Sequence, residues 1–531
     1  MAHTSRRRKR RKKTKRCSVR KKRHARRSSV PASPHAVDAR RRKRHARKCV
    51  RKKKHHKKKR HHASAPVPPV QPVPPPPKPP APPAPPAPFR LPSPIAVYSG
   101  PFGVRQAERL LWRAGFGPSP GHAEALAKLG LHRAVASLTR PSGPETLTGA
   151  APTDSDGNPI SPTDAWGHDH LWFLDRMVRT NQPLVERMTL VWHDWFATSN
   201  EKVDQQSLML DQNALFRRYA LGSFEGLVHD VTQDPAMILW LDLDQNTRWD
   251  PNENYGREVM ELFTLGANRG AYTENDVREL ARALTGFDDD WSAELGYHNF
   301  HFDPSRHDPT NKTVFGQTGA FDWQDAARMV VRHPLHPSFF IDKLWSYFIP
   351  APPTSTERQK LESTYVASGR QVRPVLEAIL LHPQLHQGPR MVKPPVVFLA
   401  GMLRALRRAI DSDDWVWLCE TAGQRLFYPP DVSGWDDSKW LDTSTTRGRW
   451  QLVTYGLLGR QLQDAQISAY DATETPAQAL TAALAFWGNP GLTTDSSGVL
   501  TTFAQTCLPA SMANWEQHQY RGLRQNALRQ L

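Results

Sequence analysis

Apolar residues recur every three or four positions over most of the chain after residue 98, which is the spacing of amphipathic helices. The pattern is most regular in residues 252–287, where it predicts two helices joined by a short loop. The first helix is predicted to begin near Asn254, a common N-cap residue, and to end at Gly266. The second is predicted to begin at Thr273, whose side chain would form a capping box with Asp276. Because short connections make such helices antiparallel neighbours, their facing sides can share one site.

Similar helical patterns occur on both sides of this pair, at residues 104–114, 121–129, 131–139, 164–180, 183–198, 207–220, 223–233, 322–333, 337–348, 356–368, 371–381 and 394–409. One stretch alternates instead: residues 297–303, with Phe300 and Phe302 on one face, predict a strand that pairs with residues 313–315. We therefore predict a mainly α-helical fold, a multi-helix single domain with a small β-hairpin insertion.

Composition divides the chain into four segments. Residues 1–62 carry 31 Lys and Arg and one acidic residue, Asp38, so their net charge is +30, whereas the rest of the chain carries −9. A segment with so little to bury is predicted to be disordered. Residues 63–97 are rich in proline and predict a stiff linker. Residues 98–465 hold the helical domain, and residues 466–531 are predicted to form a C-terminal helical extension.

The basic segment predicts an arm that binds a polyanion, which would be nucleic acid, anionic lipid or an acidic cell-wall polymer. It contains no aromatic residue to stack on bases, so binding to nucleic acid would be independent of sequence and sensitive to salt. The alternative is a solvated tail without a specific partner. No run of about 18 apolar residues occurs, so we expect no transmembrane segment. The sequence as written has no secretory signal and predicts a cytoplasmic protein, or an exported one if the start site is misassigned.

Two carboxylates of the first helix in residues 252–287 are candidates for chemistry. Glu258 lies within the apolar arc of this helix, and Glu261 lies at its edge. A buried carboxylate is costly unless it is paired or bound to a metal. One interpretation is a structural ion pair between Glu258 and Arg278 or Arg282 of the second helix. The other is a site in which Glu258 and Glu261 perform metal or proton chemistry.

Three further places carry candidate residues. His193 could act as a general base or a metal ligand beside Asp194, although the helical step places it away from the centre of the apolar face. Asp242 ends an apolar run and precedes several oxygen-bearing side chains, which suits a hard divalent cation, or else a polar loop. His307 and Asp308 form a third polar group. The four cysteines are too far apart in sequence to indicate a disulfide framework or a zinc site.

Several stretches resemble, in sequence and in order, a bacterial family catalogued as domain of unknown function 1800. They are residues 252–287 and RLLWRAGFGPSP (109–120), LVWHDWFATS (190–199), DPAMILWLD (234–242), FHFDPSRHD (300–308), FIDKLWSYF (340–348) and LFYPPDVSGWDDSKWLDT (426–443). The resemblance implies a helical, often exported protein encoded beside a sulfatase-like exported protein, which is therefore an expected partner. It implies no established activity. Trp195 stands where many relatives have a second histidine, which argues against a two-histidine metal site.

Our first hypothesis is a metal-assisted, hydrolase-like enzyme that acts on an anionic or extracellular polymer. Its catalytic residues would be Glu258, Glu261, His193, His307 and Asp308. Asp242 and Glu258 would bind a divalent metal ion, and the site would lie in one cleft between the central helices. The alternative hypothesis is a non-catalytic binding or assembly protein, whose helical body docks a partner while the basic arm holds a polyanion. Nucleophile elbows, Walker loops, dinucleotide fingerprints and HExxH motifs do not occur in the sequence.

Overall fold

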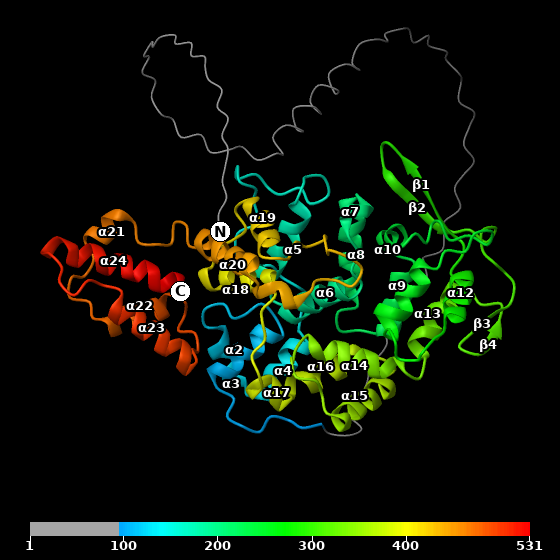
Figure 1. The fold of residues 1–531 in the computed structure, drawn as a ribbon, viewed down its shortest axis with the longest axis horizontal. Coiled ribbons are helices and arrows are strands. Elements are labelled where there is room, and N and C mark those ends of the chain that lie inside the picture. Colours follow the sequence, from blue (N-terminus) through cyan, green and yellow to red (C-terminus); the bar gives the residue numbers. More distant parts are fainter. Residues whose placement is uncertain (1–94) are drawn as a thin grey trace, which may run out of the picture. The chain divides into compact units, whose positions relative to one another are not determined.

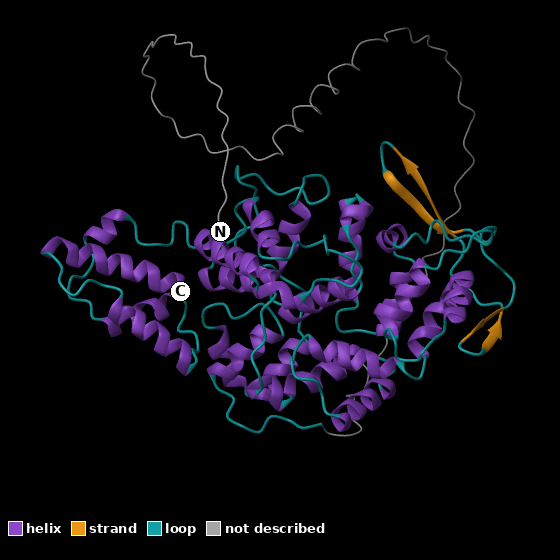
Figure 2. Ribbon diagram, in the orientation of Figure 1, coloured by secondary structure: helices purple, strands orange, loops and turns teal. Residues whose placement is uncertain are grey.

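The computed structural model of the protein describes residues 95–531, and these contain 23 α-helices and two small antiparallel hairpins. Figure 1 follows the elements in chain order, and Figure 2 shows how little of the described chain forms strands. The prediction of a mainly α-helical fold is confirmed. The predicted basic tail, and the linker up to residue 94, lie outside the described residues.

The first helices of the described chain pack against helices that occur much later in the sequence. Their bounds are α2 Val104–Arg113, α3 His122–Leu129, α4 Leu131–Thr139, α15 Ser355–Ala367, α16 Val372–Leu381 and α17 Pro383–Gln387. Helix α2 lies against α17, and α4 lies against α16. Arg109 and Arg113 of α2 both donate hydrogen bonds to the main-chain oxygen of Pro389, at 2.9 and 3.0 Å. These bonds fix the loop that follows α17.

The larger hydrophobic core lies beneath the helices in the middle of the sequence. Their bounds are α6 Pro183–Trp195, α7 Asn200–Val203, α8 Gln206–Arg218, α9 Phe224–Thr232, α10 Pro235–Trp240, α13 Trp323–Arg332 and α14 His336–Ser346. Aromatic rings fill its centre. The ring centroids of Trp195 and Phe224 are 5.5 Å apart, those of Trp195 and Phe340 are 5.7 Å apart, and those of Phe224 and Phe340 are 4.8 Å apart. Such rings bury large apolar areas, so this core holds α6, α9 and α14 together.

A second hydrophobic core lies between α5, which precedes the central helices in the sequence, and α18 to α20, which follow them. Their bounds are α5 His168–Arg179, α18 Pro395–Leu406, α19 Asp414–Thr421 and α20 Thr443–Gly456, with a short 3₁₀ helix at Asp437–Leu441 before α20. Phe173, Leu399, Trp415 and Leu452 are fully buried in it. The long loop between α19 and α20 crosses this core and carries the stretch from Leu426 to Trp435.

The helices after residue 463 have a small core of their own. Their bounds are α21 Asp464–Ser468, α22 Pro476–Phe486, α23 Thr494–Thr506 and α24 Asn514–Gln530. This core buries Ala479, Ala483, Ala504 and Leu528. The same helices carry a buried ion pair between Arg524 and Glu474, with a nitrogen–oxygen distance of 3.0 Å. Within residues 95–531, no helix combines the length and hydropathy needed to cross a membrane.

The paired helices in residues 252–287 are α11 Asn254–Glu258, a π-helix at Val259–Thr264, and α12 Glu274–Ala283. The predicted capping box is confirmed: the Asp276 carboxylate accepts from the Thr273 main-chain N–H at 2.8 Å, and the Thr273 hydroxyl accepts from the Asp276 N–H at 3.3 Å. The prediction of Asn254 as N-cap is wrong. Asn254 is the first helical residue, and its N–H donates to the Asn252 side chain at 2.9 Å.

The two hairpins follow α12 in the chain. Strand β1 (Phe287–Ser292) pairs with β2 (Gly296–Phe302), and β3 (Lys312–Val314) pairs with β4 (Gln317–Gly319). The predicted strand at residues 297–303 is present, but its predicted pairing with residues 313–315 is wrong. Each strand pairs with its nearest neighbour in sequence, because a short connection costs less chain entropy than a long one.

Candidate functional site

Glu258 and Glu261 lie on either side of the junction between α11 and the π-helix, and both are partly buried. Burial and the Glu261 carboxylate raise the pKa of Glu258 above its ordinary value of 4.5. The predicted ion pair with Arg278 or Arg282 is wrong. The Nε atom of Arg278 lies 4.0 Å from the Glu253 carboxylate, and Arg282 forms ion pairs with Glu279 and Asp308. Both arginines therefore have carboxylate partners other than Glu258. Glu258 has no hydrogen-bond or ion-pair partner among residues 95–531, and it keeps part of its surface in water.

His193 is buried in the interior, with 1% of its surface exposed, although the helical pattern placed it away from the centre of the apolar face. Its Nε2 accepts a hydrogen bond from the N–H of Phe427 at 2.9 Å. The N–H of the preceding residue, Leu426, donates to Nδ1 of His170 at 3.0 Å. Burial lowers the pKa of His193 to about 3, so its imidazole is neutral near pH 7. In this structure His193 therefore anchors the loop between α19 and α20.

Asp242 already has several partners in the structure. Its carboxylate accepts from the Lys202 ammonium at 2.7 Å, from Gln245 at 3.1 Å and from Asn254 at 3.1 Å. Its backbone has a positive φ of 58°, which is uncommon for a residue other than glycine. The carboxylate therefore connects α7, α11 and the turn after α10.

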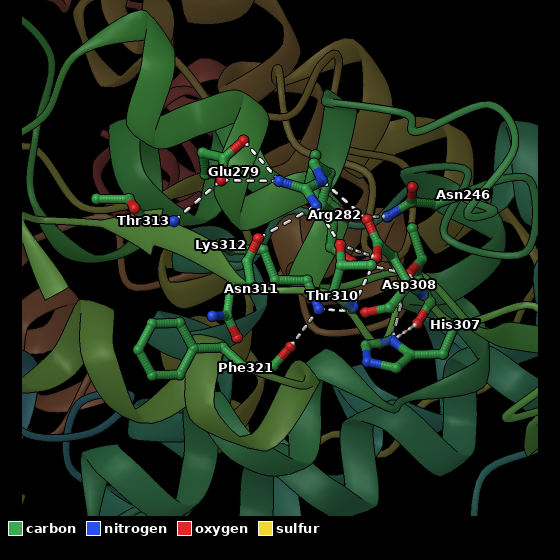
Figure 3. Close-up of polar contacts among 12 residues, drawn as sticks. Asn246, Glu279, Arg282, His307, Asp308, Thr310, Asn311, Lys312, Thr313 and Phe321 are labelled. Atoms are coloured by element: carbon green, nitrogen blue, oxygen red, sulfur yellow. Dashed lines mark hydrogen bonds and ion pairs between the residues drawn. The ribbon is translucent and has the colours of Figure 1, made fainter. Parts of the chain in front are cut away.

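His307 and Asp308 belong to a polar network that fastens the hairpin region to α12 (Figure 3). His307 donates through Nδ1 to the main-chain oxygen of Thr285 at 2.9 Å. The Asp308 carboxylate accepts from Arg282 at 2.8 Å and from the hydroxyl of Thr310 at 2.6 Å. Burial acts to raise the pKa of Asp308, but hydrogen bonds from Thr310 and Arg282 outweigh it, and the pKa falls to about 2. Lys312 donates to the main-chain oxygens of Asp308 and Phe321.

The structure does not connect the predicted site residues to one another directly. Within residues 95–531, no hydrogen bond or ion pair joins any two of Glu258, Glu261, Asp242, His193 and His307. In the same part of the chain, no group of three or more His, Cys, Asp or Glu side chains is placed to hold a metal ion. The catalytic and metal-binding roles of these residues stay predictions.

A different group of polar residues meets beside Asp194 of α6. Lys343 lies on α14, Tyr347 follows α14 directly, and Trp435 comes from the loop between α19 and α20. We call these four residues, together with Arg187 of α6, the Asp194 cluster. All except Arg187 are partly buried and keep some exposed surface. The cluster therefore joins three segments that are far apart in the sequence, and it reaches solvent.

Hydrogen bonds hold the Asp194 carboxylate in one orientation. One oxygen accepts from the hydroxyl of Tyr347 at 2.6 Å, and the other accepts from the N–H of Trp435 at 2.9 Å. Gly434 has a positive φ of 93°, and a side-chain carbon added there would collide with Asp194. Glycine is therefore required at this position so that the loop can approach the carboxylate.

Lys343 connects the Asp194 cluster to the π-helix. Its ammonium donates to the main-chain oxygen of Leu262 at 3.0 Å and lies 4.6 Å from the ring centroid of Trp195. The next two carbonyls of the π-helix accept from Trp195 at 2.9 Å and from His336 at 2.8 Å. Side chains thus satisfy three consecutive carbonyls, which explains why a π-helix is stable here. The indole of Trp195 therefore has a structural role at the π-helix.

Burial changes the pKa values of the ionisable residues in the cluster, and in each case it favours the uncharged form of the side chain. Burial raises the pKa of Asp194, although hydrogen bonds from Tyr347 and Trp435 oppose it. Burial lowers the pKa of Lys343 to about 8, with Asp194 opposing the shift. The pKa of Tyr347 is raised well above 10 by burial and by Asp194. Near pH 8, Lys343 can therefore gain or lose a proton while Tyr347 remains a hydrogen-bond donor.

Arg187 is the unusual member of the cluster. Only 5% of its surface is exposed, and its Nε and Nη1 atoms have no hydrogen-bond partner among the described residues. Burial lowers the pKa of Arg187 to about 10, while Tyr347 and Asp194 oppose the shift. Asp194 forms no ion pair within 4.0 Å with either cation in the described chain. The two cations and Asp194 therefore influence one another's pKa values without a direct ion pair, and the Asp437 carboxylate also acts on Asp194.

Reasoning from the sequence gave these residues no joint role. Asp194 was predicted only as a neighbour of His193, and Lys343 and Trp435 lie in stretches that carry the family resemblance. One signal was available: the stretches 190–199, 340–348 and 426–443 carry the family resemblance, and each contains a polar or aromatic member of the cluster. Their spatial meeting could not be read from one sequence, because helical periodicity describes single elements and not the contacts between them.

Comparison with protein families gives a match over residues 109–525, which is most of the chain and extends past residue 443, where the resembling stretches end. Comparison with curated proteins and with solved structures gives no match. The matched region includes all members of the Asp194 cluster and most of the C-terminal helices. The chain therefore belongs to the family described as Protein of unknown function (DUF1800).

Proposed function

We propose that this protein is a hydrolase-like enzyme acting on an anionic polymer, and that the Asp194 cluster performs its proton transfers. The observation that carries the proposal is the meeting of Asp194, Lys343 and Tyr347 in a partly buried place where the pKa values of the acid and the amine move toward neutral pH. Catalytic groups need such shifts because efficient proton transfer requires a pKa near the working pH.

Each residue of the cluster has a distinct role in the proposal. Lys343, with a pKa of about 8, acts as the proton acceptor or donor. Tyr347 donates a hydrogen bond to Asp194 at 2.6 Å and keeps its proton, so its role is to orient the carboxylate. The buried ring of Trp195 lies 4.6 Å from the Lys343 ammonium, and the main-chain N–H of Trp435 donates to Asp194. Within residues 95–531, Glu258, Glu261, His307 and Asp308 form no hydrogen bond or ion pair with the cluster, so the proposal gives them no part in the proton transfers.

The charge of the cluster supports an anionic substrate. Arg187 and Lys343 contribute positive charge beside the Asp194 carboxylate, and the Asp437 carboxylate acts on Asp194 and Tyr347 from nearby. Arg113 lies near Arg187, and the positive charge of Arg187 lowers the pKa of Arg113. The Arg113 guanidinium therefore adds positive charge on this side of the cluster. A buried guanidinium without an acceptor has a large desolvation cost, which an anionic group would offset. We infer that Arg187 holds a negative group of the substrate.

Competitive acetylation of the full chain, read by peptide mass spectrometry, tests the proton-transfer role. Labelling of Lys343 should rise with pH around a midpoint of about 8. The variant Asp194→Asn should lower this midpoint, because the carboxylate stabilises the ammonium. Lys128 is exposed, and its labelling in the same digest is the control for the reactivity of the reagent at each pH. A Lys343 midpoint at the ordinary lysine value of about 10.4 would contradict the proposal.

Hydrolysis assays provide the functional arm of the test. Chromogenic phosphomonoesters, phosphodiesters, carboxylic esters and glycosides should be offered to the parent chain and to Lys343→Met, with Lys128→Met as the matched control. At least one class should be cleaved with a rate that rises through about pH 8 and falls by at least about 100-fold in Lys343→Met. Equal hydrolysis rates for the parent chain and Lys343→Met with every class of substrate would contradict the enzyme hypothesis.

A second candidate function is a non-catalytic binding or assembly protein with a polyanion-binding arm. The separation of charge favours it: residues 1–62 carry +30, while the rest of the chain carries −9. A sulfatase-like exported partner belongs to this candidate and rests on the family resemblance alone. Under this hypothesis, partner binding would persist in Lys343→Met, whereas under the first hypothesis hydrolysis would be lost.

A further inference from the structure

An open surface hollow with a volume of about 830 Å³ lies apart from the Asp194 cluster and shares no lining residue with it. Four arginines line it, and one acidic residue: Arg140, Arg217, Arg218, Arg373 and Glu145. We call this feature the arginine hollow. Its volume is in the range of known ligand sites, and its lining has more basic than acidic side chains, which favours an anionic ligand.

The arginines keep donors for a ligand although three of them are already paired. Arg140 binds Glu377 through Nε at 2.7 Å and one Nη at 3.0 Å, which leaves its other Nη. Arg218 uses one Nη for Asp230, at 3.1 Å. Arg373 is exposed and has no hydrogen-bond or ion-pair partner among residues 95–531. The guanidinium groups are therefore positioned, and several of their N–H donors remain available.

Arg217 has a supporting role at the hollow. It binds both oxygens of Glu186, at 2.6 and 2.9 Å, and its guanidinium also donates to Asn213 at 2.7 Å. The acidic lining residue, Glu145, pairs with Arg176. The one carboxylate in the lining is thus engaged by a cation outside the lining, and it neutralises none of the four arginines directly.

Two helix N-termini also reach the hollow. Helix α6 has 13 residues and α16 has 10, and neither has a side-chain hydrogen bond at its N-cap. Gln182, the N-cap of α6, lines the hollow, and so does Arg373, the second residue of α16. The helix dipole places partial positive charge at these ends, where anions are stabilised. It adds to the field of the arginines.

We propose that the arginine hollow binds a phosphate or sulfate group of a larger ligand. Guanidinium groups bind tetrahedral oxyanions through paired N–H donors, and several arginines around one open space suit more than one such group. Small apolar residues in the lining, such as Val185 and Leu221, leave room for the part of the ligand that carries the groups. The site is independent of the proposed catalytic chemistry, so either can fail without the other.

Hydrogen exchange of the full chain, read by mass spectrometry, tests the site in place. Tripolyphosphate represents a phosphate ligand, and a sulfated tetrasaccharide represents a sulfate ligand. We expect at least one of them to slow amide exchange in residues 182–186, 214–222 and 371–376. The basic segment 1–62 will also attract these probes, but its peptides are separate in the digest. Which probe protects the hollow decides between the two oxyanions.

Charge reversal at the hollow provides the matched comparison. Arg373→Glu should remove the protection and weaken the probe's affinity for the hollow at least tenfold. Because Arg373 is exposed and unpaired in the described chain, the variant should fold as the parent does. Arg447→Glu, at another exposed arginine outside the hollow, makes the same change of net charge and should retain protection. Absence of protection with both probes, or equal loss in both variants, would overturn the proposal.

Discussion

At the scale of single residues, the surroundings of a side chain decide what it can do. His193 has a side chain suited to proton transfer, but burial lowers its pKa to about 3 and its Nε2 is occupied by the N–H of Phe427. Lys343 is an ordinary residue by type, yet burial brings its pKa to about 8. Asp308 is held ionised by Arg282 and Thr310, with a pKa of about 2. The more reactive group near pH 7–8 is therefore the lysine.

The unpaired carboxylate of Glu258 leads to a prediction about stability and pH. Its raised pKa means that ionisation costs more in the folded than in the unfolded chain, so its contribution to stability is lost as pH rises through the folded-state pKa. Glu258→Gln should therefore be more stable than the parent near pH 7, by less than about 1 kcal/mol because the group is partly solvated. Urea unfolding at several pH values measures the difference.

Below pH 4.5 the carboxyl group is protonated in both states, so the advantage of Glu258→Gln should disappear there. The same substitution at exposed Glu294 is the control for changes unrelated to burial. A difference between parent and Glu258→Gln that stays constant across this pH range would show that the electrostatic explanation is wrong.

At the scale of elements, helix ends follow local sequence where the capping partners are neighbours. Thr273 and Asp276 cap α12 as their spacing predicted. The π-helix at Val259–Thr264 has another origin: its stability depends on Lys343, Trp195 and His336, which donate to its carbonyls from α14 and α6. No local signal could predict it, because the donors are far away in the sequence.

Asp276 should contribute more to stability than its capping partner does. Thr273→Ala removes a single cap and should cost about 1 kcal/mol. Asp276 also accepts from the N–H of Phe315 at 2.7 Å, so Asp276→Ala breaks the cap and the link to the β3–β4 hairpin. We expect an additional loss of about 1 kcal/mol for the second bond. Denaturant unfolding measures both variants, and equal losses would mean that the hairpin contact adds nothing.

At the scale of the whole molecule, charge and hydrophobic burial are separated along the chain. The apolar cores lie within residues 95–531, whereas residues 1–62 hold 31 of the 72 Lys and Arg residues and few apolar ones. The net charge of +21 therefore conceals a basic segment joined to a mildly acidic remainder. Solubility and encounter with polyanions will depend on the segment, and folding will depend on the cores.

Deletion of residues 1–62 should leave the cooperative thermal unfolding of the remaining chain unchanged, because the segment has little to bury. The same deletion should abolish binding to double-stranded DNA, used as a generic polyanion, which in the parent should weaken steeply as salt increases. Scanning calorimetry and titrations at several salt concentrations measure the two effects. Loss of the unfolding transition, or DNA binding that survives the deletion, would each contradict the assignment of charge and fold to separate segments.

The sequence by itself determined the helical class, the presence of a strand at residues 297–303, the cap of α12 and the division by charge. These features depend on periodicity, neighbouring residues and composition, all of which are visible in one dimension. The strand pairing was predicted wrongly because the alternating pattern does not specify a partner. The ion pair of Glu258 was predicted wrongly because a helical arc shows which face is apolar, and not which charges of a neighbouring helix will reach it.

Only the tertiary structure brought Arg187 and Asp194 of α6 together with Lys343, Tyr347 and Trp435, and formed the arginine hollow from helices distant in sequence. Burial also set the direction of their pKa shifts, and burial is a property of the packed chain. Chemistry at these sites depends on distances between segments that are far apart in the sequence. Those distances arise when the aromatic core between α6, α9 and α14 closes, and so they are absent from any local pattern.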